Sequence, residues 1–158
     1  MTEPDAPLLD RIDLEILRQL QADGRLSNAE LAERVHVSPA TCHRRTQRLL
    51  REGHVTAVQA RVNPASVGLG ALVMVGVVLD RSTPESFAAF EGAARTMPEV
   101  LECQLVAGDF DYLLKIRVRD MGDFNALHGQ ALIALPGVRQ IRTFFVIKEV
   151  KEAAALPF

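Results

Sequence analysis

The sequence predicts an α+β chain with an all-helical first third and a mixed sheet-and-helix remainder. Two observations predict this fold class. Apolar residues before Gly53 recur at the three- and four-residue spacing of helices, whereas those after residue 71 largely alternate as in strands. The 158 residues suffice for one ordinary domain or two small ones, and the 48% hydrophobic content suffices for a core.

The first two helices have clear start and stop signals. Apolar residues at helical spacing run from Asp10 to Asp23, and Gly24 follows as a stop. In the next stretch, LSNAEL, Ser27 and Glu30 form a capping box that is flanked by leucines. This pattern predicts a second helix that ends near Val35.

A third helix begins after the short connector His36-Val37. Ser38 suits the N-cap, Pro39 suits the first helical position, and Gly53 suits the end. Two helices joined by so short a turn are typical of a helix-turn-helix motif.

The third helix carries most of a local basic block. From Ser38 to Arg61 there are five arginines and one acidic residue, a local charge of +4 in a chain whose net charge is −2. The block has no acidic partner four residues away within the arginine run, and it lies on the helix that enters the major groove in such motifs. We therefore expect DNA binding, with a merely solvated helix face as the alternative. The candidate contacts are Ser38, Ala40, Thr41, His43, Arg44, Arg45 and Arg48.

The rest of the chain predicts a linker followed by six alternating elements. The segment 54–63 has extended character, Asn63-Pro64 breaks it, and 62–70 is the expected linker. The order strand, helix, strand, strand, helix, strand is the ferredoxin-like pattern. The expected ranges are 71–80, 83–97, 100–106, 111–119, 121–135 and 138–150.

The first of these strands, ALVMVGVVLD, is apolar on both faces. Both helices of a ferredoxin-like unit cover the same face of the sheet, so the other face needs a second cover. A second copy of the chain is the simplest one, and this predicts a homodimer. An unusually apolar exposed strand is the alternative.

The stretch LVAGDFDYLLKI places Asp109 and Asp111 on either side of Phe110, just after Gly108. Gly108 lets the main chain approach a ligand closely, and a carboxylate can bind an ammonium group. Three interpretations stay open: a ligand-recognition loop, a turn whose aspartates bond nearby amides, and a catalytic carboxylate pair, which nothing else in the chain supports.

The sequence gives little support for catalysis, for metal binding, or for a membrane or secreted location. The two cysteines and four histidines form no metal-ligand spacing, and no nucleophile–base pair or cofactor loop is visible. We therefore expect no enzyme activity, no metal and no cofactor. No apolar run approaches the roughly 20 residues of a membrane helix, and residues 1–10 have no signal-peptide pattern. The expected location is the cytoplasm, in association with the nucleoid.

Several stretches together carry a family resemblance. LDRIDLEILRQLQADGRLSNAELAERVHVSP, RRTQRLLREGHV, ECQLVAGDFDYLLKIRVRDM and LPGVRQIRTFFVIKEVK resemble the Lrp/AsnC family of transcription regulators, from about Leu9 to Lys151. The resemblance implies a winged-type helix-turn-helix domain over 1–61, a linker over 62–70, and a ferredoxin-like effector-binding and oligomerisation domain over 71–158.

The resemblance also implies partners and a ligand. It implies a regulator that binds double-stranded DNA, senses a free amino acid and forms dimers that assemble into octamers. The effector would sit between protomers, near the loop that joins the second and third strands of the regulatory domain. The implied effector residues are Ala107, Gly108, Asp109, Asp111, Thr143 and Phe145. Phe144 and Phe145 favour a hydrophobic amino acid such as leucine or methionine. The alternative function is an architectural DNA-compacting protein without an effector.

Overall fold

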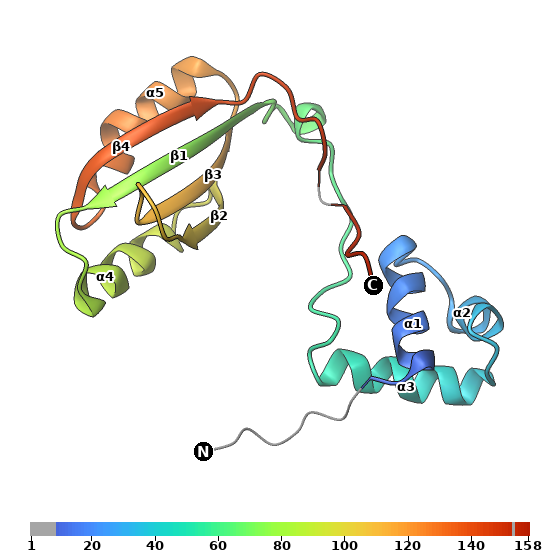
Figure 1. The fold of residues 1–158 in the computed structure, drawn as a ribbon. Coiled ribbons are helices and arrows are strands. Elements are labelled where there is room, and N and C mark those ends of the chain that lie inside the picture. Colours follow the sequence, from blue (N-terminus) through green and yellow to red (C-terminus); the bar gives the residue numbers. More distant parts are fainter. Residues whose placement is uncertain (1–8, 153) are drawn as a thin grey trace. The chain divides into compact units, whose positions relative to one another are not determined.

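The computed structural model describes residues 9–152 and 154–158, which form two compact units (Figure 1). The first unit extends to Arg61 and includes Lys151–Phe158, and the second comprises Val62–Val150. The described residues after 150, which the sequence prediction placed in the second domain, group with the first unit.

The first unit contains three helices, which are capped as the sequence predicts. Asp10 caps the first helix through a capping box with Asp13, and Ser27 caps the second through a capping box with Glu30. Ser38 caps the third helix, with Pro39 in its first turn. The helices are α1 (Arg11–Ala22), α2 (Asn28–Arg34) and α3 (Pro39–Arg51).

The three helices share one small core, and the turn between α2 and α3 is tight. His36 adopts a positive φ of 56°, and the Val37 N–H donates to the Ala32 carbonyl at 3.1 Å. This turn holds α2 and α3 together in the helix-turn-helix arrangement. The core residues are Ile16, Leu31, Ala32, Val35, Cys42 and Leu49.

The second unit is the expected ferredoxin-like domain. Its four strands form an antiparallel sheet in the order β2-β3-β1-β4. A short 3₁₀ helix, η1 (Pro64–Val67), lies in the predicted linker, and a second one, η2 (Leu132–Ala134), follows the last α-helix. The other elements are β1 (Ala71–Leu79), α4 (Pro84–Ala94), β2 (Val100–Leu105), β3 (Tyr112–Val118), α5 (Met121–Gln130) and β4 (Val138–Phe145).

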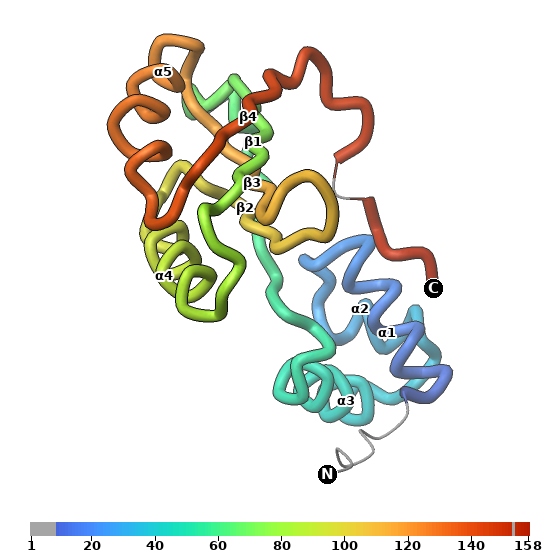
Figure 2. Tube along the Cα trace, turned by 60° about the vertical axis from the view of Figure 1, so that its left-hand side comes forward, coloured from blue at the N-terminus to red at the C-terminus, as the bar shows by residue number. Residues whose placement is uncertain are grey.

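Helices α4 and α5 cover the same face of this sheet (Figure 2). The core between the helices and the sheet is apolar, and the Tyr112 hydroxyl, at its edge, donates to the Glu91 carboxylate at 2.9 Å. The fully buried members from the sheet are Val73, Val75, Val77, Tyr112, Leu114, Ile116 and Val118; those from the helices include Phe90 and Leu132.

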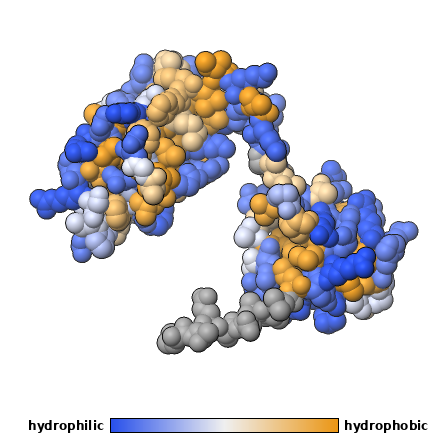
Figure 3. All heavy atoms as spheres, in the orientation of Figure 1, coloured by the Kyte–Doolittle hydropathy of each residue, from blue (hydrophilic) through white to orange (hydrophobic). Residues whose placement is uncertain are grey.

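The opposite face, called here the open face, is partly covered by the chain itself. Leu72 and Arg117 are each 8% exposed. The Val146 N–H donates to the Leu72 carbonyl at 3.0 Å, and the Arg117 guanidinium pairs with Glu149. Figure 3 shows hydrophobic side chains at the surface of this unit, among hydrophilic ones. Local loops therefore provide some of the cover that sequence analysis attributed to a second copy.

Three element predictions differ from the structure. The last strand ends at Phe145 rather than residue 150, because the chain turns to pair Arg117 with Glu149. The helix expected over 121–135 ends at Gln130 and continues as η2. The segment 54–63 contains no strand. In the described residues, no helix is long and apolar enough to cross a membrane.

Candidate functional site

The first two turns of α3 present a mixture of exposed and engaged side chains. Ala40, His43 and Arg44 are exposed. Ser38 is also exposed, but its Oγ accepts the Thr41 N–H at 3.3 Å and lies 2.9 Å from Thr41 Oγ1. Both hydroxyls therefore take part in the N-cap of α3. They can bind a phosphate or a base only by sharing or giving up the hydrogen bond between them.

Arg45 and Arg48, two of the predicted DNA contacts, are held in ion pairs and do not project freely into solvent. Arg45 Nη1 donates to Asp13 Oδ1 at 2.8 Å and to Asp10 Oδ2 at 2.7 Å. Arg48 Nη2 donates to the other Asp13 oxygen. These hydrogen-bond acceptors lie at the start of α1, more than 30 residues away in sequence, and Arg48 Nε also lies 3.8 Å from Glu52, four residues further on.

Asp13 is the centre of this cluster and is only 1% exposed. It also accepts the Asp10 N–H at 3.2 Å, so it is part of the capping box and of two ion pairs. The pKa of the Asp10 carboxyl is lowered, first by the bond from the Asp13 N–H and then by Arg45. The bond to Asp13 raises the pKa of the Arg45 guanidinium. The cluster ties the start of α1 to the middle of α3.

Fewer arginines of α3 are free to bind DNA than the local charge of +4 suggests. Arg44 and Arg51 are exposed and, within the described chain, form no ion pair. They lie seven residues apart, on one face of the helix. A guanidinium there can bind a phosphate, or a guanine edge in the major groove.

The loop between β2 and β3 is anchored at its base by Asp111. The Asp111 N–H donates to the Val77 carbonyl at 2.9 Å, and its carbonyl accepts the Val106 N–H at 2.9 Å. Its carboxylate accepts the Leu79 N–H at 2.7 Å and lies 3.5 Å from the Ser82 hydroxyl. Asp111 therefore has the structural role that sequence analysis left open for these aspartates.

The tip of the same loop is open to solvent. Ala107, Gly108 and Asp109 are all exposed, and the Asp109 carboxylate accepts no hydrogen bond from the described residues. Gly108 has a φ of 146°, a conformation that disfavours any residue with a side chain. The exposed Asp109 carboxylate lies next to Gly108, in a loop that Asp111 anchors. It can therefore accept hydrogen bonds from an ammonium group.

Phe110 turns back from the loop onto the open face of the sheet, the side from which the loop projects in Figure 2. A Cβ atom at Gly76 would lie 2.6 Å from the Phe110 ring, so the ring rests directly on the β1 backbone. The ring also lies 6.2 Å from that of Phe144, and the Arg142 guanidinium is 5.9 Å from its centre. Sequence analysis missed this contact, although a glycine inside an apolar strand is a signal of close approach.

The two β4 residues in the predicted effector set lie on the other face. Thr143 pairs with Val75 and Phe145 with Val73, and both valines belong to the core beneath the helices. The Phe145 ring contacts Phe124 of α5 at 5.2 Å. Because side chains alternate along β4, Arg142 and Phe144 lie on the open face and contact Phe110. Thr143 and Phe145 lie on the opposite face, so the structure does not bring them together with Phe110.

No metal centre is found in residues 9–152 and 154–158, because no three His, Cys, Asp or Glu side chains are grouped to hold an ion. Cys42 is buried in the first core, and Cys103 is an exposed free thiol on β2.

Both units match known protein families. Residues 9–56 match the model of a winged helix-turn-helix DNA-binding domain, and residues 72–156 match that of the Lrp/AsnC ligand binding domain. The chain belongs to the Lrp/AsnC family. It is thus a DNA-binding transcription regulator with a ligand-binding domain, and the two domains follow in the family order.

Individual Lrp/AsnC relatives cover nearly the whole chain. The leucine-responsive regulatory proteins of Escherichia coli and Salmonella typhimurium are each 47% identical over 148 residues, which is 94% of this chain and 90% of theirs. A regulator from Neisseria meningitidis, solved in complex with L-methionine, has a TM-score of 0.89 and 38% identity, covering 95% of this chain and 97% of its own. An AsnC-family regulator from Agrobacterium tumefaciens has a TM-score of 0.87 and 32% identity, with coverages of 94% and 96%.

Proposed function

We propose that this Lrp/AsnC protein is a non-enzymatic regulator whose hold on double-stranded DNA responds to a free amino acid. The observation that carries the proposal is the loop between β2 and β3, where the exposed Gly108–Asp109 tip stands on a base fixed by Asp111. The neisserial relative in complex with L-methionine supports an amino acid as the ligand class.

In this proposal each end of the amino acid has a partner at the loop. The Asp109 carboxylate binds the ammonium group, and main-chain N–H groups around Gly108 bind the carboxylate. Phe110 and Phe144, which lie together on the open face, supply apolar surface for a hydrophobic side chain such as that of leucine or methionine. Recognition needs no covalent step and no cofactor.

The DNA contact is made by the exposed part of α3. Arg44 and Arg51 bind phosphates or guanine edges, and the exposed Ala40 and His43 face the bases of the major groove. Arg45 and Arg48 act mainly by holding α3 in place through Asp13. In the cell, the protein would act in the cytoplasm at the nucleoid, on genes of amino-acid metabolism.

The protein acts as a homodimer that assembles into an octamer. The open face keeps hydrophobic surface beyond the local loops, because Phe144 is 50% exposed and Met74 next to it is half-buried. A second copy would cover these side chains. The ligand changes DNA binding only if it binds one arrangement of the assembly more tightly than another.

A thermal-shift screen of the purified protein against the common amino acids tests this function. A ligand that binds only the folded protein must raise its melting temperature. We expect a rise for one or a few related hydrophobic amino acids, and none for them in Asp109→Ala. If no amino acid raises the melting temperature while DNA binding persists, an architectural DNA-compacting protein without an effector becomes the better interpretation.

A further inference from the structure

A groove in the first unit runs beside α1, and the segment at Leu156 and Phe158 forms part of its wall. Its volume is about 580 Å³, and Leu17, Leu20 and Val55 contribute to its apolar wall. Leu156 and Phe158 line the same groove. Figure 1 shows this segment, in dark red, beside α1. Neither DNA recognition nor ligand binding, as proposed above, uses this groove.

Gln21 recognises the main chain of the segment at Leu156. Its Nε2 donates to the Leu156 carbonyl at 3.1 Å, and its Oε1 accepts the Leu156 N–H at 2.9 Å. One side-chain amide thus satisfies both main-chain groups of a single residue, as a neighbouring β-strand would. Such a pair of bonds fixes the segment in an extended conformation and in one register.

Arg18, one turn earlier on α1, holds Phe158. Its Nε donates to the main-chain oxygen of Phe158 at 2.6 Å, and its guanidinium lies 5.6 Å from the centre of the Phe158 ring. Glu15 accepts a bond from Arg18 Nη1 at 3.1 Å, which orients the guanidinium. A cation over an aromatic face is attractive even at a partly exposed site.

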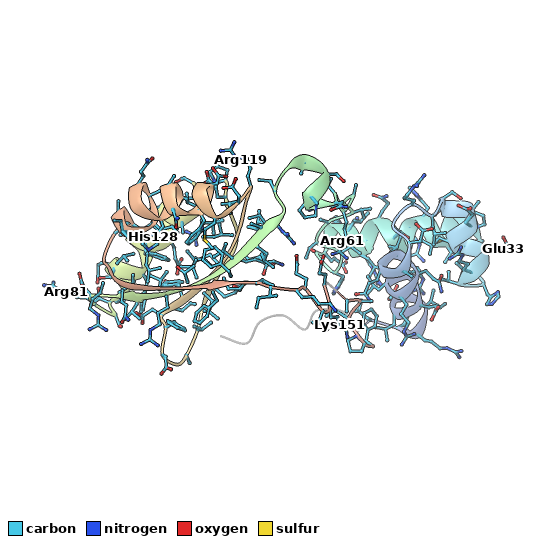
Figure 4. All side chains as sticks on the ribbon, turned by 90° about the horizontal axis from the view of Figure 1, so that it is seen from above. Glu33, Arg61, Arg81, Arg119, His128 and Lys151 are labelled. Carbon is cyan, nitrogen blue, oxygen red and sulfur yellow. The ribbon has the colours of Figure 1, made fainter. Side chains whose placement is uncertain are left out.

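A weaker contact joins Arg61 to Glu152. Arg61 Nη2 is 3.4 Å from Glu152, and both side chains are exposed; Arg61 is labelled in Figure 4. An exposed pair of this kind contributes little alone. The pair brings the end of the first stretch of this unit together with the start of its second stretch, 151–158.

We propose that the α1 groove is a docking site for the chain's own segment Leu156–Phe158, bound in cis. Docking gives the helix-turn-helix unit a second attachment to the ligand-binding unit, through residues 146–155, in addition to the linker after Arg61. The occupant is the chain's own segment because its bonds to Gln21 and Arg18 are made in this fold, and a tethered segment has a high effective concentration at its site.

Tryptophan fluorescence of the full-length protein tests the docking, because the chain contains no tryptophan. The variant Phe158→Trp places a single indole in the groove. We expect Arg18→Ala and Gln21→Ala, added to this variant, to shift its emission to longer wavelength and to increase acrylamide quenching. The control Arg11→Ala, an exposed arginine on the same helix, should leave both unchanged. An emission typical of free indole in every variant would overturn the proposal.

Amide exchange in the chain without tryptophan covers the case in which Phe158→Trp itself prevents docking. The Leu156 N–H should exchange slowly, and Gln21→Ala should remove that protection. A fast Leu156 amide in the unmodified protein would contradict docking.

A mixing experiment separates docking in cis from docking on a second copy. The Phe158→Trp chain is refolded with a tenfold excess of chains that carry Arg18→Ala and Gln21→Ala. With docking in cis, each indole stays on its own intact α1 and the emission is unchanged. A shift to longer wavelength means that the segment docks on the neighbouring subunit, and the cis proposal is then wrong.

Discussion

The Asp13 carboxylate accepts a hydrogen bond from Arg45 at 2.8 Å and so joins the first turn of α1 to the middle of α3. Asp13 is buried, whereas the Arg45 side chain is 18% exposed. The arrangement places an acidic group beneath a basic helix, where it fixes the helix without competing for DNA at its outer surface. It also divides the α3 arginines into a supporting pair and an outward pair.

Asp13→Ala should destabilise the helix-turn-helix unit by about 2–3 kcal/mol, because it removes the hydrogen-bond acceptor of Arg48 and leaves Arg45 with Asp10 alone. Chemical denaturation measures the change. The control is Glu33→Ala, an exposed acid on α2 that points away from the first unit in Figure 4, and it should change stability by less than about 0.5 kcal/mol. Equal effects of the two variants would mean that the cluster does not support α3.

Arg44→Ala and Arg45→Ala should weaken DNA binding in different ways. Loss of the exposed Arg44 should reduce the slope of log affinity against log salt by about 0.9, the value for one lost phosphate contact, with an unchanged melting temperature. Loss of Arg45 should lower the melting temperature, since it removes two ion pairs. Salt titrations of DNA binding and thermal melts of the same samples separate these effects. A stable Arg45→Ala protein with a reduced slope would make Arg45 a direct DNA contact.

Alanine variants of the two loop aspartates should distinguish ligand binding from the stability of the loop. Asp111→Ala removes the acceptor of the Leu79 N–H and should destabilise the folded protein by about 1–3 kcal/mol. The same variant should also lose the ligand response. Asp109→Ala should abolish the ligand-induced rise in melting temperature and leave the unliganded melting temperature unchanged. If Asp109→Ala keeps a full response, the main-chain groups of the loop hold the ligand without it.

Gly76→Ala should displace Phe110, because the new methyl group would lie 2.6 Å from its ring. The sheet itself should persist, since β1 keeps its pairing partners on both sides, but the ligand-induced shift in melting temperature should fall. Adding Phe110→Ala should restore some stability by making room. Gly92→Ala on α4, where a Cβ meets no atom within 4 Å, is the matched control. It should be neutral or stabilising.

Low pH should weaken the second unit through Asp123. A bond from the Arg119 side chain holds the pKa of this carboxyl at about 2, below the value of about 3.9 in an unfolded chain. The stabilising contribution is therefore present above about pH 4 and is lost as the pH falls towards 2. Urea midpoints measured from pH 5 to pH 2 should fall more steeply in the wild type than in Arg119→Met. Parallel curves would show that the pair has no effect.

Much of the fold follows from local sequence signals. The capping residues Ser27 and Ser38 begin their helices as predicted, and the order of strands and helices in the second unit is confirmed. Local patterns suffice there because caps and alternation act over a few residues. The β4 boundary was wrong, since the contact between Arg117 and Glu149 brings together residues 32 apart in sequence.

The candidate sites were harder to predict, because their contacts also join residues that are far apart in sequence. The loop at Gly108 was visible as a glycine–aspartate turn, but the separate roles of Asp109 and Asp111 depend on the partner at Leu79. The ion pairs of Arg45 could not be read from α3 alone. An acid at position 13, within the apolar stripe of α1, was the available signal, since a charge at a buried helical position needs a partner.

The contacts of α1 with Leu156 and Phe158 also have a consequence for biogenesis. The first unit is assembled from two separated stretches of chain, so the ligand-binding unit is a domain inserted within it. During synthesis the three helices leave the ribosome first, yet their groove stays open until the sheet has been made and the residues after 150 have followed. During translation the helix-turn-helix unit thus gains its contacts with Leu156 and Phe158 only after the whole ligand-binding unit has been synthesised.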